Sequence, residues 1–345
     1  MIREVLQHFA LATDEPKADA FGTGLINYTW LVIANSKRYI LQRINVNVFK
    51  DPCAIDDNIT SLDKYLKKNF PDYLFTSPVV SKEGKTLVEK EDKYFRMFEF
   101  IEGSHAYTVL QNPGLAYEAA KQFGRFTKLL SGFDADKLKI TIPDFHNLSL
   151  RYQQYQNALS NANARRLSKA QPTIDALKEH ENIVETFKTI NANPAFKKRV
   201  THHDTKISNV LFDKNNKGIC VIDLDTVMPG FFISDVGDMM RTYLSPADEE
   251  ETDFSKIDVR ENYFSAIVEG YLSEMQDVLT DEEKKYFAYA GKFMIYMQAL
   301  RFLADYLNND TYYGAKYESH NLNRAINQLT LLNILVTKES KLKSC

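Results

Sequence analysis

Cysteine is scarce in this chain, and its pattern excludes several kinds of site. The 345 residues include three cysteines, Cys53, Cys220 and Cys345, which are widely spaced and form no CxxC pair. This odd number does not fit a disulfide framework or a zinc site, and it fits the reducing cytoplasm. Cys220 stands in the apolar run 219–222, which predicts a buried thiol rather than a nucleophile. We therefore expect a cytoplasmic protein.

Long hydrophobic runs and an excess of one charge are also missing. No stretch approaches the roughly 20 apolar residues of a membrane span. The opening residues MIREVLQHFALATDEP have no long apolar core and no small-residue cleavage pattern, so we expect no signal peptide. The 43 basic and 46 acidic residues leave a net charge of −3, which attracts neither nucleic acid nor an anionic membrane. We expect neither as a partner, and no protein partner is evident.

The apolar and charged fractions, 44% and 26%, allow a soluble protein with a sizeable core. Up to about residue 100, short runs rich in Val, Ile, Tyr and Phe alternate with turn residues, which is typical of strands. We predict these strands at 24–34, 38–44, 78–80, 86–88 and 94–100. One helix is predicted among them at 51–68, because its apolar residues recur at helical spacing.

Beyond residue 100 helical patterns dominate. We predict helices or helical segments at 112–132, 147–198, 255–279, 282–307 and 320–336. A strand–loop–strand unit at 199–228 lies among them. The sequence therefore predicts an α+β protein of two lobes, a β-rich N-terminal lobe (1–100) and a larger helical lobe (101–345). A cleft between two lobes is where we expect a nucleotide to bind.

The strand–loop–strand unit carries the residues that phosphoryl transfer needs. Residues 202–209 read His-His-Asp-Thr-Lys-Ile-Ser-Asn, and residues 222–225 read Ile-Asp-Leu-Asp. A carboxylate such as Asp204 can take the proton of an attacking hydroxyl, and Lys206 can offset charge on the moving phosphoryl group. Asn209 and Asp223 offer oxygen ligands to Mg²⁺. These parts predict a kinase that uses ATP and Mg²⁺ on a small molecule, with His202 bracing the loop.

A purely structural explanation has to be weighed against this one. Asp204 and Asn209 can also form turn hydrogen bonds, and short motifs recur by chance. Lys206 and an apolar strand that ends at Asp223 make chance less plausible. A pseudokinase is a further alternative, although it would be free to lose these side chains. A metal-dependent hydrolase is weakly supported, because the histidines lack ligand spacing.

These residues resemble the catalytic loop and metal-binding segment of the aminoglycoside phosphotransferase and choline kinase family, which is related to protein kinases. The resemblance implies that Asp204 is the base and that Asn209 and Asp223 are metal ligands. Residues 21–29, Phe-Gly-Thr-Gly-Leu-Ile-Asn-Tyr-Thr, resemble the loop of this family that covers the phosphates. It assigns Gly22, Gly24 and Asn27 to the nucleotide, although two glycines also suit an ordinary hairpin turn. A GxxxxGK[ST] loop is absent, which excludes a Walker-type site.

The family also has a basic residue on the third strand that binds the α and β phosphates. Here this strand reads Tyr-Ile-Leu-Gln-Arg over residues 39–43. Register favours Gln42 and charge favours Arg43, and we assign Arg43 while leaving both open. The acidic partner on the following helix is Asp56 or Asp57. In the segment that joins the lobes, residues 98–103, we assign Glu99 to the nucleotide site.

The resemblance narrows to the N-acetylhexosamine 1-kinase branch through residues 39–45, 202–213, 221–230 and 301–307. It implies a small-molecule sugar acceptor, GlcNAc or GalNAc, phosphorylated at the anomeric hydroxyl. Arg301 and Asp305 lie one helical turn apart and so share a face, although a surface ion pair would show the same spacing. The other residues assigned to the sugar are Tyr312, Tyr317, Arg324, Asp204 as base, and Asp225, which is alternatively a second metal ligand.

A cationic acceptor is the main competing substrate. A choline, ethanolamine or aminoglycoside kinase would require a dense acidic or aromatic cage around the positive charge. The C-terminal region is mixed instead, with Arg301, Lys316 and Arg324 beside Asp305, Asp310 and Glu318. This mixture favours a neutral sugar.

Overall fold

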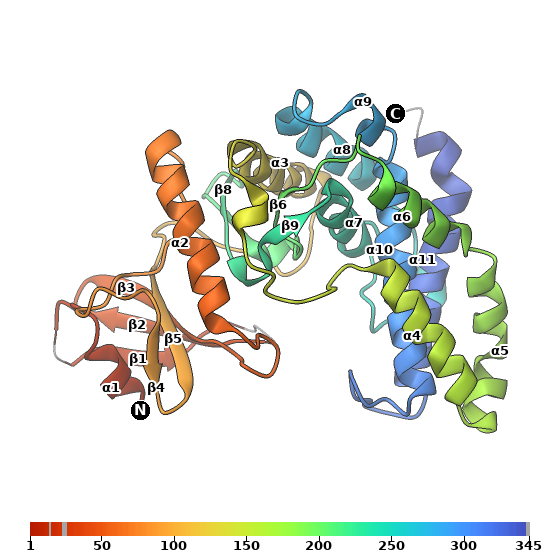
Figure 1. Ribbon diagram of the computed structural model, residues 1–345, viewed down its shortest axis with the longest axis horizontal. Helices are drawn as coiled ribbons and strands as arrows, with labels where there is room; N and C mark the ends of the chain where they lie inside the picture. Colours follow the sequence, from red (N-terminus) through yellow and green to blue (C-terminus); the bar gives the residue numbers. More distant parts are fainter. Residues whose placement is uncertain (14, 23–25, 343–345) are drawn as a thin grey trace. The chain divides into compact units, whose positions relative to one another are not determined.

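The computed structural model describes residues 1–13, 15–22 and 26–342. It has two compact units, each made of several segments of the chain. Unit 1 contains Met1–Ala106, Leu129–Pro143 and Asn209–Pro229, and unit 2 contains Tyr107–Lys128, Asp144–Ser208 and the chain from Gly230 onward. The α+β fold predicted from the sequence is confirmed: an antiparallel sheet forms in unit 1, and helices dominate unit 2 (Figure 1). The division of roles at residue 100 stays a prediction.

The sheet of unit 1 is antiparallel in the order β1-β2-β3-β5-β4. Its strands are β1 (Lys17–Ala20), β2 (Tyr28–Ala34), β3 (Lys37–Arg43), β4 (Val88–Lys90) and β5 (Lys93–Glu99). Strands β2, β3 and β5 match predicted strands, β4 shares only Val88 with the strand predicted at 86–88, and β1 is an addition. The strand predicted at 78–80 is wrong, because Pro78 forms only an isolated bridge to Phe98. Proline has no N–H to continue a ladder.

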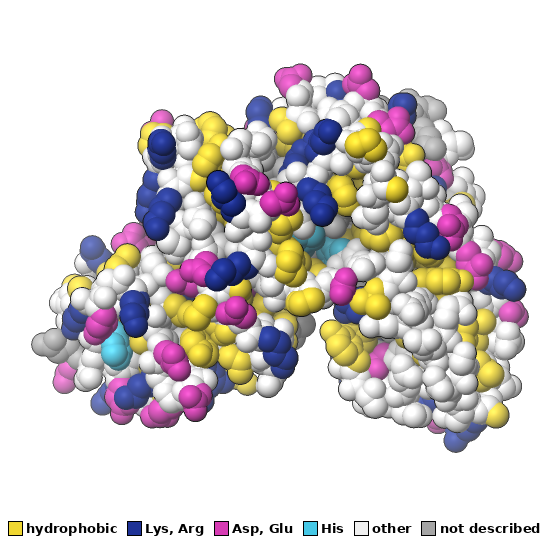
Figure 2. Space-filling view, in the orientation of Figure 1, with side chains coloured by type: hydrophobic (Ala, Val, Ile, Leu, Met, Phe, Trp, Pro, Cys, Tyr) yellow, Lys and Arg dark blue, Asp and Glu magenta, His cyan; other side chains and the backbone are white. Residues whose placement is uncertain are grey.

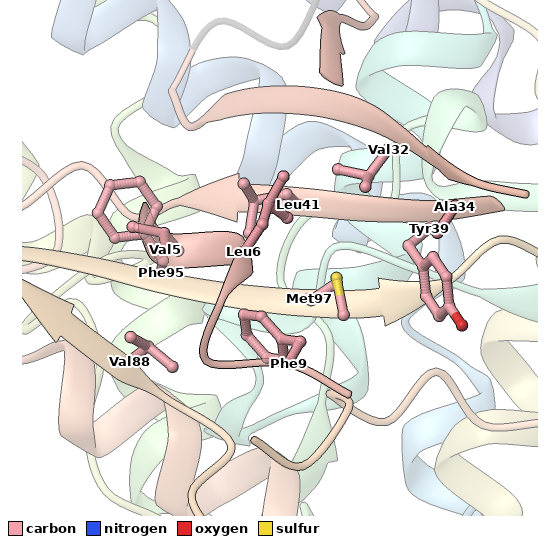
Figure 3. Close-up of a cluster of buried hydrophobic side chains, with 10 residues drawn as sticks. All are labelled: Val5, Leu6, Phe9, Val32, Ala34, Tyr39, Leu41, Val88, Phe95 and Met97. Carbon is pink, nitrogen blue, oxygen red and sulfur yellow. The ribbon is translucent and has the colours of Figure 1, made fainter. Parts of the chain in front are cut away.

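Two helices accompany this sheet, α1 (Ile2–Leu6) and α2 (Pro52–Asn69). The side chain of Asp51 caps α2 by accepting a hydrogen bond from the N–H of Ala54 at 3.0 Å, and proline suits the first turn. Helix α1 packs Val5 and Leu6 on one face of the sheet, against Leu41 of β3 and Phe95 and Met97 of β5 (Figure 3).

Alternation along the strands gives the other face of the sheet different chemistry. Gln42 and Arg96 are partners in the register between β3 and β5. Because successive side chains point to opposite faces, they point away from the cluster that contains Leu41, Phe95 and Met97. The sheet therefore buries an apolar layer on one side and places a polar pair on the other.

The strand–loop–strand prediction at 199–228 is resolved into short elements. They are β6 (Arg199–Thr201), β7 (Val210–Phe212), β8 (Gly218–Val221) and β9 (Met228–Gly230), with the short helices η2 (Ile207–Asn209) and η3 (Leu224–Thr226). Strands β7 and β8 form an antiparallel hairpin. The side chain of Asp213 accepts the N–H groups of Asn215 and Lys217, at 2.7 and 2.9 Å, and so closes the turn.

Unit 2 is built around a central helix, α10 (Phe287–Leu307), which packs against α4, α7 and α11 (Figure 1). The segment predicted as one helix at 282–307 is two, because α9 ends at Lys284. The other helices are α3 (Pro113–Leu129), α4 (Leu148–Asn161), α5 (Ala164–Lys178), α6 (Asn182–Ala192), α7 (Phe232–Tyr243), α8 (Glu261–Met275), α9 (Asp281–Lys284) and α11 (His320–Leu342). Gly237 lets α7 approach α10, since a Cβ there would collide with the carbonyl oxygen of Ala290.

Charges of both signs lie on the face of the protein that Figure 2 shows. In Figure 2, Lys and Arg side chains are interspersed with Asp and Glu side chains. Across the described residues, every helix is too short or too polar to cross a membrane.

Candidate active site

Asp204 lies in the loop after β6, in unit 2, and its carboxylate faces an ammonium group. Its Oδ1 is 3.2 Å from Nζ of Lys206. The side chain of Asp204 is 17% exposed and that of Lys206 is 47% exposed. The two charged groups predicted to perform the chemistry are therefore paired with each other and accessible from outside the loop.

The backbone of this loop is held by carboxylates from helix α7. Asp235 accepts the N–H groups of His202 at 3.1 Å and His203 at 2.7 Å. Asp238 accepts the N–H of Thr205 at 2.8 Å. Asp235 and Asp238 therefore organise the backbone of this loop. Such bonds fix the loop around Asp204 before any substrate arrives.

Burial is the main cause of the shifted pKa values of Asp235 and Asp238. It raises the pKa of Asp235 from 3.8 to about 7, and the nearby carboxylates of Asp238 and Asp204 act in the same direction, against the two amide hydrogen bonds. Burial also raises the pKa of Asp238, and Arg241 opposes this shift. The guanidinium of Arg241 donates to Asp238 at 3.2 Å and to Glu249 at 3.0 Å. The charge of Asp238 is thus compensated by Arg241 within unit 2.

The two histidines before Asp204 have separate roles. The buried ring of His202 lies edge-on to Phe123 and Phe126 of α3, with centroids at 5.1 and 6.1 Å, which fits its predicted bracing role. His203 has a left-handed backbone, φ 67°, and its Nδ1 is 3.5 Å from Nδ1 of His146. Gly230 is required beside it, because a Cβ there would be 2.5 Å from the His203 ring. The His203–His146 contact was missed by the sequence reasoning.

The predicted metal ligands, both in unit 1, are brought together by the β7–β8 hairpin. Asn209 precedes β7 and Asp223 follows β8, where Val210 pairs with Val221. The N–H of Ile222 donates to the carbonyl of Asn209 at 2.9 Å. Asp223 is held at φ 61°, an uncommon backbone conformation of the kind that recurs at functional sites.

These two oxygen donors fit Mg²⁺ better than a metal held wholly by protein. Within 1–13, 15–22 and 26–342, no three His, Cys, Asp or Glu side chains gather as metal ligands. Mg²⁺ commonly takes one or two protein ligands and obtains the rest from phosphates and water. The pair Asn209 and Asp223 meets that requirement, and its role stays a prediction.

Asp225, two residues beyond Asp223, is buried in protein contacts of unit 1. It forms an ion pair with Arg96 of β5, and its Oδ2 accepts a hydrogen bond from Asn27 at 2.7 Å. Asn27 in turn accepts the N–H of Asn45 at 3.0 Å. Asn27 thus connects the predicted phosphate loop to the segment after Asp223. The proposed metal and sugar roles of Asp225 remain predictions.

The other residues predicted to bind the nucleotide are Gly22, Gly24 and Glu99. Gly22 has φ 77°, a left-handed conformation that suits glycine. Gly24 lies outside the described residues. Glu99 is exposed at the end of β5. Their contacts with a nucleotide remain predictions.

Besides Gln42 and Arg43, the structure offers Arg96 as a third candidate for the residue that binds the phosphates. The guanidinium of Arg43 stacks over the exposed ring of Tyr28, 3.8 Å from its centroid. The amide oxygen of Gln42 accepts from Nε and Nη2 of Arg96, at 3.1 and 2.9 Å. Arg96 was missed, although its place between Phe95 and Met97 in a strand was a signal that it faces the opposite side.

The two acids considered on α2 also separate. Asp57 is exposed and forms an ion pair with Lys139. Asp56 accepts a hydrogen bond from Thr86 Oγ1 at 2.7 Å. Burial raises the pKa of Asp56, and the charge of Arg96 opposes that shift. Of the two acids, Asp56 is therefore the one whose pKa shift is opposed by the charge of the buried Arg96.

Unit 2 contains a pocket of about 380 Å³ between α4, the end of α10 and the loop that follows. Arg301, Asp305 and Tyr312 line it, and Tyr317 and Arg324 are not among its lining residues. The other polar residues in its wall are Arg151, Gln154, Asn157, Asn161, Asn308, Thr311 and Tyr313. Arg324 is engaged instead with Glu249 and Glu250, and stacks 3.8 Å above Phe302.

Asp305 is committed to the protein rather than to Arg301. Its Oδ1 accepts the N–H of Tyr312 at 2.7 Å, and its Oδ2 accepts the N–H of Tyr313 at 2.9 Å. Oδ2 also accepts from Asn321 at 3.1 Å. Arg301 donates to Gln298 at 3.2 Å and lies 5.5 Å from the centroid of Tyr313. The one-turn spacing of Arg301 and Asp305 was read correctly, but in the described chain it does not form an ion pair.

The arginine end of this pocket acts on the histidine beside the loop. Burial, then the charges of His203, Arg301, Arg241 and Arg151, hold the pKa of His146 well below 6.5. Burial and Arg301 also lower the pKa of Arg151. His146 contacts His203, the residue before Asp204. The charges of Arg301 and Arg151 in the pocket therefore act on a side chain that touches the loop.

Comparisons with known proteins bear on this geometry. A family model described as the phosphotransferase enzyme family matches residues 17–272. An aminoglycoside phosphotransferase from Alicyclobacillus acidocaldarius has a similar structure, with a TM-score of 0.66 and 14% identity, over 99% of this chain and 96% of that one. A microcompartment-associated aminopropanol kinase has a TM-score of 0.64 and 15% identity, over 99% and 97%. A spectinomycin phosphotransferase solved with ADP and spectinomycin has a TM-score of 0.59 and 13% identity, over 98% and 97%.

Proposed function

This chain belongs to the phosphotransferase enzyme family, and from that premise we propose that it is an ATP- and Mg²⁺-dependent kinase of N-acetylhexosamines. The proposed reaction transfers the γ-phosphoryl group of ATP to the anomeric hydroxyl of GlcNAc or GalNAc, which yields the sugar 1-phosphate and ADP. The fold is that of kinases and phosphotransferases that act on alcohols.

The proposed chemistry assigns each charged group of the loop one task. Asp204 accepts the proton of the anomeric hydroxyl as its oxygen bonds to phosphorus and the bond to the ADP oxygen breaks. Lys206, whose Nζ lies 3.2 Å from the Asp204 carboxylate, supplies positive charge to the phosphoryl oxygens. The amide bonds to Asp235 and Asp238 keep the loop in place during transfer.

The nucleotide side rests on the residues of unit 1. Asn209 and Asp223 would hold Mg²⁺, which offsets the negative charge of the phosphates when bound. ADP is the nucleotide found with the similar spectinomycin phosphotransferase, and it supports the choice of an adenine nucleotide here.

The observation that carries the choice of acceptor is the charge of the pocket in unit 2. Of the described residues that line it, Asp305 is the only acid, and backbone N–H groups occupy both its oxygens. Arg151 and Arg301 face the same space without a carboxylate partner in the described chain. An ammonium group would meet two like charges and no free acid, whereas hydroxyl and acetamido oxygens can accept from guanidinium groups. A neutral sugar therefore suits this pocket.

The pocket also offers the shape and side chains that sugars require. Its volume of about 380 Å³ lies in the range of small-molecule sites, roughly 300–1,000 Å³. Amides from Gln154, Asn157 and Asn308 provide donors and acceptors for hydroxyls, and Tyr312 and Tyr313 provide flat apolar faces.

Amino alcohols and aminoglycosides are the second candidate, favoured by the substrates named for the similar structures. An acceptor screen separates the candidates. ATP and Mg²⁺ would be offered with GlcNAc, GalNAc, choline, ethanolamine and kanamycin, with ADP release followed and the phosphate located by NMR. We expect turnover on the hexosamines, with phosphate at C1.

Two controls make the screen decisive. The Asp204→Asn variant should show no transfer, which excludes a contaminating kinase. Turnover on a cation with none on hexosamines would reject the sugar assignment and keep the kinase. Normal nucleotide binding with no transfer to any alcohol would favour a pseudokinase.

A further inference from the structure

We propose that Arg96 of β5, rather than a residue of β3, anchors the phosphates of the nucleotide. This inference rests on the proposed use of a nucleotide and adds a residue to it. The ligand it would take is an oxygen of the α or β phosphate of a nucleoside di- or triphosphate. All the residues involved belong to unit 1.

The guanidinium of Arg96 is buried but incompletely bonded. Its side chain is 2% exposed, Nε and Nη2 donate to Gln42, and Nη2 also pairs with Asp225. Nη1 is buried and has no hydrogen-bond partner among the described residues. A buried donor that lacks a partner costs about 1–3 kcal/mol and more for a charged group. An arginine with one unfilled donor is therefore suited to bind an anion.

The surroundings of Arg96 identify the kind of anion. Its partner Asp225 is two residues from Asp223 and is also bonded to Asn27 in the glycine-containing loop. Asp225 thus links Arg96 to the segment that carries the predicted metal ligand and to the loop predicted to cover phosphates. Planar guanidinium groups bind phosphate oxygens through fixed pairs of N–H donors.

Arg43 is the rival anchor, and its geometry is less suitable. Its guanidinium stacks on Tyr28, a side chain that is 54% exposed. Arg43 itself is half-buried, and its guanidinium is already engaged with the face of that ring. Gln42 takes the register position expected for the family's basic residue, and it holds Arg96 instead.

The test measures nucleotide binding by calorimetry, without catalysis. Adenosine, AMP and ADP would be titrated into wild type, Arg96→Met and the matched variant Arg43→Met, with Mg²⁺ held at one saturating concentration in every titration. We expect Arg96→Met to weaken ADP binding about tenfold or more, while adenosine changes less than about twofold. Arg43→Met should leave both affinities within about twofold.

Arg96→Met leaves Asp225 buried without its ion-pair partner, which destabilises the fold. The fold of the variant is checked by thermal melting. The same substitution is also made in the Asp225→Asn variant, in which loss of Arg96 leaves no unpaired buried carboxylate. The Arg96→Met effect on ADP relative to adenosine should persist there.

Three results would overturn the proposal: ADP binding unchanged on loss of Arg96, equal losses for adenosine and ADP, or a selective loss in Arg43→Met instead. If wild type binds adenosine but no ADP, the nucleotide function falls with it. If wild type binds ADP and Arg96→Met binds it equally well, only the assignment of Arg96 fails.

Discussion

Both compact units bury a carboxylate beside an arginine, but the two pairs differ in what they leave for a ligand. In unit 2, Arg241 is shared between Asp238 and Glu249, and Asp238 also accepts the N–H of Thr205. In unit 1, Arg96 bonds to Asp225 and Gln42 and keeps a buried nitrogen without a partner among the described residues. The first pair is complete and the second is not.

The difference between the two pairs distinguishes residues that stabilise the fold from residues that bind a ligand. A satisfied buried network stabilises a local conformation, and breaking it leaves an uncompensated charge. An unsatisfied buried donor lowers stability unless a ligand completes it. We therefore expect substitutions around the loop of unit 2 to change stability, and substitutions at Arg96 to change nucleotide affinity. The following predictions test that distinction.

The largest effect is expected at Asp204. The supporting network holds the loop around Asp204 but does not supply another base. Asp204→Asn should lower turnover by roughly 10²–10⁴-fold, the usual contribution of a general base. Melting temperature and ADP affinity should match wild type, because the bonds to Asp235 and Asp238 remain. Steady-state kinetics and calorimetry measure this, with exposed Asp277→Asn as the control. Near wild-type turnover in Asp204→Asn would remove the proposed base.

Breaking the complete pair should cost stability. Asp238→Ala removes the partner of Arg241 and the acceptor of the Thr205 N–H. Loss of one member of a buried ion pair costs about 3–5 kcal/mol. Urea unfolding should show this decrease, whereas Asp277→Ala should change little. A variant as stable as wild type would mean that Asp238 does not support the loop.

The metal ligands should behave as binding residues of unit 1. Asn209→Ala and Asp223→Ala should each weaken the apparent affinity for Mg²⁺ in the presence of ATP by about tenfold or more, given that even second-layer ligands cost roughly 10–100-fold. Higher Mg²⁺ and ATP should recover part of the activity. Calorimetry showing normal Mg-ATP binding in both variants would contradict the metal roles.

Arg301 extends the comparison to the pocket of unit 2. Arg301→Ala should raise the KM for the hexosamine far more than the KM for ATP, by roughly 5–150-fold, since a buried polar group that loses its partner costs about 1–3 kcal/mol. Each substrate is varied in turn. Ala304 lies in the same wall, and Ala304→Ser serves as a mild control. An equal rise in both KM values would place Arg301 outside the acceptor site.

The last prediction, small per pH unit, is a dependence of stability on pH caused by Asp235. Because burial raises its pKa to about 7 in the folded chain, against 3.8 ordinarily, the folded state holds this proton more tightly. Its contribution to stability is complete below about pH 4 and is lost as pH rises through 7, at no more than about 1.4 kcal/mol per pH unit. Unfolding across this range should show the slope in wild type and not in Asp235→Asn. Parallel profiles would contradict the assignment.

Local patterns were enough for much of the fold. The apolar spacing at 51–68 and 112–132 predicted α2 and α3, and alternating β-formers predicted β2, β3 and β5. The short spacing of Asp204, Lys206 and Asn209 predicted a single loop, because residues so few positions apart cannot lie far from one another. The break between α9 and α10 was missed, since an apolar pattern can continue across two helices.

Contacts between distant segments could not be predicted in the same way. The sequence determined which groups are available: an acid and a lysine on one short loop, two oxygen ligands at the ends of a hairpin, and arginines near the C-terminal helices. Only the tertiary structure decided that Asp225 meets Arg96 and that Asp305 serves the backbone of Tyr312 and Tyr313. Periodicity tells which face a residue occupies, but the partner it meets there depends on how separate elements pack.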